Sequence, residues 1–169
     1  MCGCHPTASS SVPARPEARL LISNYNGAAG HGLAAIFENG VAKVVATNDF
    51  GRPPRVVWSR PLSAAEQAFL AERIDRTPLD RLLESYEDPN VWDGLQLSFQ
   101  IRPTGGANHD VSVHNRYVKE LAALTDAANV LLPPEYRVGY REWKDVKDRE
   151  EAEAAAEKDP DAAGDPPQQ

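Results

Sequence analysis

The alternation of apolar and polar residues from Leu95 to Arg102 constrains the fold of this chain more than any other feature. A period of two is typical of a strand with one buried and one solvated face. A turn containing Gly105-Gly106 follows, and alternation resumes over Asp110–His114, so the two segments are expected to pair antiparallel. Such a sheet needs a second layer over its apolar face. The apolar members of the first segment are Leu95, Leu97, Phe99 and Ile101.

Further strands are expected upstream, at residues 20–25, 33–37, 41–47 and, as a short piece, 56–58. Asn39-Gly40 lies between the second and third of these segments. This pair favours a type I′ hairpin turn, because both central residues of that turn need positive φ.

Helix signals follow the hairpin. Ser63 and Glu66 form a capping box ahead of apolar residues at helical spacing, which predicts a helix starting there. Thr77 and Pro78 are expected to open a second, short helical turn, because proline is well tolerated at the first helical position. The apolar side of that turn consists of Leu79, Leu82, Leu83 and Tyr86.

A last helix is expected between Asn115, as its cap, and Leu131, with Pro133-Pro134 ending it. Helices on one side of a sheet are the simplest way to bury these apolar stripes. The predicted fold class is therefore α+β, an antiparallel sheet of about five strands with two or three helices packed on one face.

The chain of 169 residues has room for one domain, expected at residues 17–143. Prolines in residues 1–16 forbid a helix there and predict a flexible tether. Residues 144–169 are expected to be an acidic, Ala/Pro-rich and largely disordered tail. The stretch 141–169 holds ten acidic and five basic residues, so most of the net charge of −7 lies there. The near-neutral domain has no basic face for phosphates, so nucleic-acid binding is not expected.

The chain opens Met1-Cys2-Gly3-Cys4-His5, followed by a Pro/Ser-rich stretch. This start resembles the mature end of a bacterial lipoprotein. The resemblance implies lipidation of Cys2, a membrane anchor and a place in the bacterial cell envelope. A lipoprotein precursor has a basic and apolar segment ahead of its cysteine, and here only Met1 precedes Cys2. An added start methionine, a start codon assigned too late and a cytoplasmic protein all remain open.

The same terminus has a second interpretation. Thiolates and imidazole are suitable ligands for a soft metal, so Cys2, Cys4 and His5 are candidate metal ligands of a cytosolic protein. A closed zinc site needs four ligands and rigid support, and only three are present here. Apart from this alternative, no metal or cofactor is expected.

Several features resemble the small bacterial emfourin-type protease inhibitors. They are Gly27 and Gly30 in the first turn, the helix start at residues 63–66, and the strands Leu95–Ile101 and Val111–Val113. The resemblance covers roughly residues 19–132. It implies a protein-binding, inhibitor-like or accessory role with another protein as partner, without identifying inhibitory residues.

No G-x-S-x-G elbow or H-E-x-x-H pattern occurs in the sequence, so the chain is not expected to be an enzyme, with an unrecognised site as the alternative. The predicted binding surface combines Asn90, Trp92 and Asp93 with the glycine-rich turn around His31, because both lie in connections. Trp92 is either a core residue or an exposed aromatic anchor for a partner.

Overall fold

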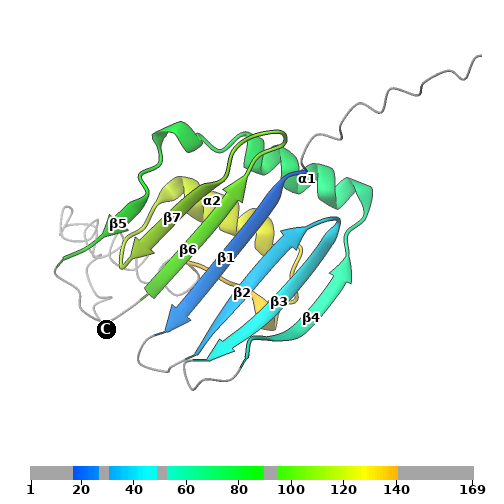
Figure 1. Ribbon diagram of the computed structural model, residues 1–169, viewed down its shortest axis with the longest axis horizontal. Coiled ribbons are helices and arrows are strands. Elements are labelled where there is room, and N and C mark those ends of the chain that lie inside the picture. The colour runs from blue at the N-terminus through cyan, green and yellow to red at the C-terminus, as the bar shows by residue number, and fades with distance from the viewer. Residues whose placement is uncertain (1–16, 27–30, 49–52, 90–94, 141–169) are drawn as a thin grey trace, which may run out of the picture.

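The computed structural model describes residues 17–26, 31–48, 53–89 and 95–140, and within these it forms a sheet with helices on one side (Figure 1). The strands are β1 (Arg19–Asn26), β2 (His31–Glu38), β3 (Val41–Asn48), β4 (Arg55–Pro61), β5 (Ser85–Glu87), β6 (Leu95–Arg102) and β7 (His109–His114). The α-helices are α1 (Ala64–Asp75) and α2 (Lys119–Asn129), and the short 3₁₀ helices are η1 (Leu79–Arg81) and η2 (Pro134–Tyr136).

The predicted α+β class is confirmed, but the predicted count of about five strands is wrong. The described residues form one seven-stranded sheet in the order β4-β3-β2-β1-β6-β7-β5. β5 runs parallel to β7, so the sheet is mixed and not wholly antiparallel. Two α-helices are present in the described part of the chain, the lower of the two numbers expected.

The extra strand comes from the segment expected to form a second helical turn. After η1 the chain extends, and the Ser112 amide donates to the Glu84 carbonyl at 2.9 Å. The predicted helical turn is therefore limited to η1, and pairing with β7 satisfies the backbone of the residues that follow it. Leu83, assigned to the buried side of that helix, is instead 61% exposed. β4 also extends over seven residues, well beyond the short piece expected at 56–58.

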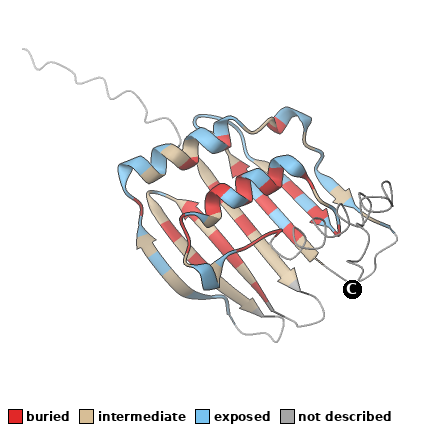
Figure 2. Cartoon of the chain, turned by 180° about the vertical axis from the view of Figure 1, so that it is seen from behind, coloured by how far each residue is buried: buried red, intermediate tan, exposed pale blue. Residues whose placement is uncertain are grey.

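The strand register aligns the apolar positions into one core. Ile22 in the central strand pairs with Ala35 on one side and with Phe99 on the other, and side chains of paired residues share a face. The two helices cover this face, and Figure 2 shows the buried positions concentrated between α2 and the sheet. The largest fully buried side chains are Phe99, Leu20, Ile22, Ile74, Ile101 and Leu121.

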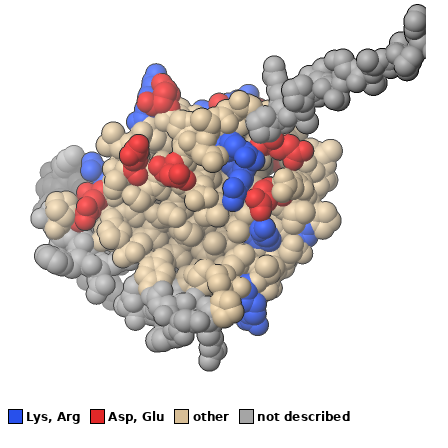
Figure 3. Space-filling view, in the orientation of Figure 1, with Lys and Arg blue, Asp and Glu red and all other residues tan. Residues whose placement is uncertain are grey.

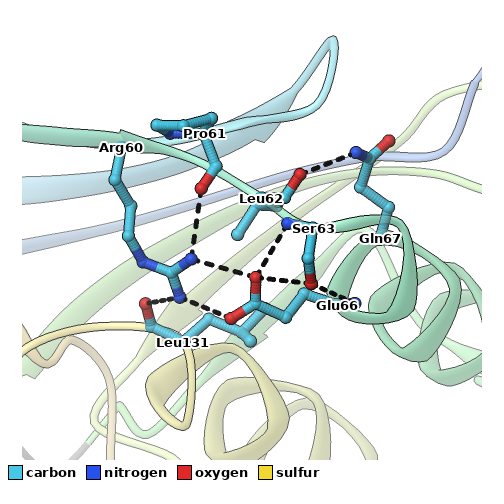
Figure 4. Close-up of polar contacts among 7 residues, drawn as sticks. All are labelled: Arg60, Pro61, Leu62, Ser63, Glu66, Gln67 and Leu131. Atoms are coloured by element: carbon cyan, nitrogen blue, oxygen red, sulfur yellow. Dashed lines mark hydrogen bonds and ion pairs between the residues drawn. The ribbon is translucent and has the colours of Figure 1, made fainter.

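Two local signals in the sequence are confirmed. Asn39 and Gly40 have φ values of 50° and 71°, as a type I′ turn between β2 and β3 requires. Ser63 and Glu66 form the predicted capping box at the start of α1. Arg60 extends this box, because its guanidinium donates to both carboxylate oxygens of Glu66, at 3.0 and 2.8 Å, and to the Leu131 carbonyl at 3.2 Å (Figure 4). These contacts join β4, α1 and the segment after α2.

The expected cap of the last helix is wrong. Asn115 is buried, has a φ of 52° and follows the last residue of β7, whereas α2 begins at Lys119 after Val118, without a side-chain cap. Asparagine tolerates the left-handed backbone conformation, and at this position that conformation turns the chain from the sheet towards the helix layer.

The segment after α2 returns to the domain. The Asn129 carboxamide donates to the Val138 carbonyl at 2.8 Å and accepts from the Val138 amide at 3.0 Å. Val138 and Tyr140 are buried, and the Tyr140 ring packs edge-on against Tyr117 at 5.3 Å. Burial raises the pKa of the Tyr140 phenol above its usual range. Residues 138–140 are thus part of the folded core.

Candidate protein-binding surface

The topology gathers four connections at one end of the sheet, here called the loop end. β1, β3, β5 and β7 finish there, and β2, β4 and β6 begin there. Three of these connections contain residues outside the described ranges, at 27–30, 49–52 and 90–94, and the fourth leads from β7 to α2. Figure 1 shows the strand termini from which they depart.

The strand register defines a row of residues across the loop end. His31 pairs with Asn26, and Asn26 pairs with Leu95 on its other side. Neighbouring strands lie roughly 4.8 Å apart, so the backbones of His31 and Leu95 are about 10 Å apart. The root of the 90–94 connection and the root of the glycine-rich turn are therefore close together, although 64 sequence positions separate His31 from Leu95.

The predicted binding residues lie only partly in the described chain. Asn90, Trp92 and Asp93 lie outside the described residues, as do Cys2, Cys4 and His5 at the amino terminus. His31 is described by its backbone alone, as the first residue of β2. The register thus places the backbone of His31 near that of Leu95, and the remainder of the predicted surface lies outside the described residues.

Trp58 has a structural role. It lies on β4 and faces the helix layer, where its ring is 6.5 Å from that of Tyr136 in η2. The Arg60 guanidinium lies 6.0 Å from the Trp58 ring centroid, within the range of a cation–π contact. Trp58 therefore helps to hold the segment after α2 against the sheet.

The sheet face turned away from the helices is divided between apolar and polar halves. Leu21, Ile36 and Val45 are half-buried on β1, β2 and β3, on the opposite face from the core positions. Towards β6 the face becomes polar, and Ser23 and Ser98 hydrogen-bond across the strands at 2.8 Å. Figure 3 shows that the middle of this face carries few charged side chains.

Charged contacts on this face lie mainly at the end opposite the loops. Glu38 is paired there with Arg19 at 3.1 Å and with Lys43 at 2.8 Å. The hydrogen bond from Lys43 is the largest influence that holds the pKa of the Glu38 carboxyl below its usual range. At the loop end, His114 and Glu87 lie 4.0 Å apart, a contact that becomes an ion pair only when the imidazole is protonated.

The histidines of β7 do not meet. His109 begins the strand and His114 ends it, and they lie on opposite faces. Within the described ranges there is no group of three or more His, Cys, Asp or Glu residues that could hold a metal ion.

The amino-terminal segment enters the domain at the end opposite the loops. β1 begins at Arg19 at that end and reaches the loop end at Asn26. Eight residues of strand span about 27 Å at roughly 3.4 Å per residue. The described chain therefore starts on the far side of the domain from the loop end.

Comparison with protein-family models and with curated proteins found no match for this chain. No helix among the described residues has the length and apolar character needed to cross a membrane.

Sequence reasoning missed one surface feature, a groove of about 640 Å³ beside β7 that is lined by Leu82, Leu83 and Asp110 among others. Its signal in the sequence was ambiguous, because Leu79, Leu82 and Leu83 have helical spacing. In the structure the chain after η1 extends to pair with β7 as β5, and Leu83, just before β5, is exposed.

Proposed function

We propose that this protein is a small envelope-tethered binding domain, with an inhibitor-like or accessory role, that engages another protein through its loop end. The observation that carries the proposal is the position of the loop end opposite the amino-terminal attachment point. A binding surface on the far side of a tethered domain faces away from the anchor. Connections presented by a rigid sheet are the usual location of binding groups.

The proposed anchor is a lipid on Cys2. A tether of the 15 residues from Cys2 to Pro16 reaches at most about 54 Å, at roughly 3.3–3.6 Å per residue. That reach lets the domain meet partners at or near the membrane surface. Mass spectrometry of the native amino terminus tests this part, and a terminal peptide with unmodified Met1 from source cells would contradict it.

Trp92 is the proposed anchor of the binding surface, with Asp93, Asn90 and the turn at His31 around it. Truncating an anchor tryptophan typically weakens binding by about 2 kcal/mol or more, which is roughly thirtyfold in Kd. We expect Trp92→Ala to weaken binding to a partner isolated from the envelope or secreted fraction by at least this factor. Its melting temperature and circular dichroism spectrum should stay close to those of the parent chain.

A matched control separates anchoring from folding. Val130 is 73% exposed at the end of α2, so Val130→Ala should leave both partner affinity and stability unchanged. If Trp92→Ala unfolds the domain, Trp92 is a core residue and the surface assignment fails. If the variant stays folded and keeps full affinity, the loop end is not the binding surface.

A further inference from the structure

The edge of the sheet at β7 is only half covered. β5 pairs with Ser112–His114 and leaves the first half of β7, His109–Val111, without a strand on its outer side among the described residues. The covered half ends where the Ser112 amide and hydroxyl both donate to the Glu84 carbonyl, at 2.9 and 3.3 Å. Before Glu84 the chain diverges from β7 towards η1.

The uncovered half presents backbone groups outward. Ser112 donates its amide away from β6, and residues two apart in a strand direct their backbone groups to the same side. The amide and carbonyl of Asp110 therefore point to the open edge, and no described residue bonds either of them. An open strand edge of this kind is a template for pairing with another extended chain.

The opposite edge of the sheet carries a proline at the end of β4. The Leu62 amide donates to the Gly40 carbonyl at 2.8 Å, so the preceding residue, Pro61, directs its nitrogen away from β3. That nitrogen carries no hydrogen, so a further strand cannot receive a hydrogen bond from this position. The register shift of β4 beside Val44 and Val45 disturbs the same edge.

Beside the open half of β7 the diverging chain leaves the groove of about 640 Å³. Leu79, Leu82 and Leu83 form its outer wall, and Leu83 is 61% exposed. Glu84 and Asp110 are the charged side chains that line it, with His109 next to them and no lysine or arginine. Figure 3 shows acidic side chains on this part of the face, near β7 and the segment that leads to β5.

We propose that this groove binds an extended segment of a partner protein, which adds as a strand to β7. The Asp110 backbone supplies the hydrogen bonds, and the leucine wall contacts alternate apolar side chains. The acidic lining selects basic residues at the intervening positions, because opposite charges across an interface favour the matching partner. The proposal concerns a surface separate from the loop end and does not depend on it.

The test uses the isotope-labelled full-length chain and an acetylated, amidated peptide of alternating lysine and valine. At saturation, we expect the Asp110 amide signal to shift and its hydrogen exchange to slow by at least about tenfold. A control peptide with proline in place of the central valine cannot complete the ladder and should bind at least about tenfold more weakly.

Two variants with the same change of charge locate the site. Leu83→Lys should weaken peptide binding by at least about tenfold, because it removes an apolar wall and repels the basic peptide. Val130→Lys, at another exposed apolar residue, should leave binding unchanged. Both positions are exposed, so both variants should fold.

Several results overturn the proposal. They are no binding at millimolar peptide, equal binding of the two peptides, unchanged binding by Leu83→Lys, and shifts confined to the loop end. The proposal also fails if, without peptide, exchange of the Asp110 amide slows as the protein concentration rises. That result would identify a second copy of the chain as the occupant of the groove.

Discussion

Replacing Asn129 by alanine should loosen the segment that returns to the domain after α2. The Asn129 side chain makes two hydrogen bonds to the backbone of Val138, at 2.8 and 3.0 Å. Each contributes about 1 kcal/mol, and the loss leaves polar groups of a residue that is 1% exposed without partners. We therefore expect a loss of about 2–3 kcal/mol in the free energy of unfolding. For a domain of this size, that lowers the melting temperature by roughly 10 °C.

Urea unfolding followed by circular dichroism measures this loss directly. Val130→Ala is the matched control, because Val130 follows Asn129 and its side chain is largely exposed, so a change within about 0.5 kcal/mol is expected. Limited proteolysis should also cleave the Asn129→Ala variant sooner near residues 137–140. A stability within about 0.5 kcal/mol of the parent would refute the reasoning, since these bonds would then not hold the segment.

Three further predictions concern the sheet, the first helix and the chain ends. The hydrogen bond from Arg60, and to a lesser extent those from Ser63, lower the pKa of Glu66 to about 2 from the usual 4.5. The stability that this carboxylate contributes is therefore present above pH 4.5 and is lost as the pH falls towards 2. In urea unfolding at stepped pH, Glu66→Gln should lack that part of the acid-induced loss, and parallel curves for the two proteins would contradict the assignment. Gly40→Ala should cost about 1–2 kcal/mol by thermal unfolding, because its φ is 71°, and an unchanged melting temperature would count against a strained turn. A chain of residues 17–148 should have a melting temperature within a few degrees of that of the full-length chain. A chain that ends at residue 132 loses the buried side chains of Val138 and Tyr140, so its melting temperature should fall by more than about 10 °C. Equal melting temperatures for the two truncated chains would show that the segment after residue 132 is dispensable.

The parts of the fold that depend on neighbouring residues were predictable from the sequence. The turn at Asn39-Gly40 and the capping box at Ser63 and Glu66 are fixed by contacts within a few positions. β5 was missed because its pairing partner, β7, lies far along the chain and nothing local distinguishes its three residues from a helical turn. Asn115 was misassigned because an asparagine before an apolar stripe is equally suited to a cap and to a left-handed turn.

The candidate surfaces also differ in how far the sequence could predict them. The sequence paired the turn at His31 with the 90–94 connection because both are connections, and the β1–β2 and β1–β6 registers explain why their roots are close. The role of Trp92 stays a prediction, because the residue lies outside the described ranges. The groove beside β7 could not be predicted, because the exposure of Leu83 depends on where β5 separates from β7.

The position of β1 at the centre of the sheet has a consequence for how the chain acquires its structure. β1 to β4 follow one another in space as in sequence, so they can assemble as soon as they are synthesised. The other side of β1 has to wait for β6, and the Ser23–Ser98 contact joins residues 75 positions apart. Closing so long a loop is slow relative to forming the hairpins. We therefore expect that β1 stays an unpaired edge on the ribosome until β6 emerges, and that the joining of these two strands is the slow step of folding.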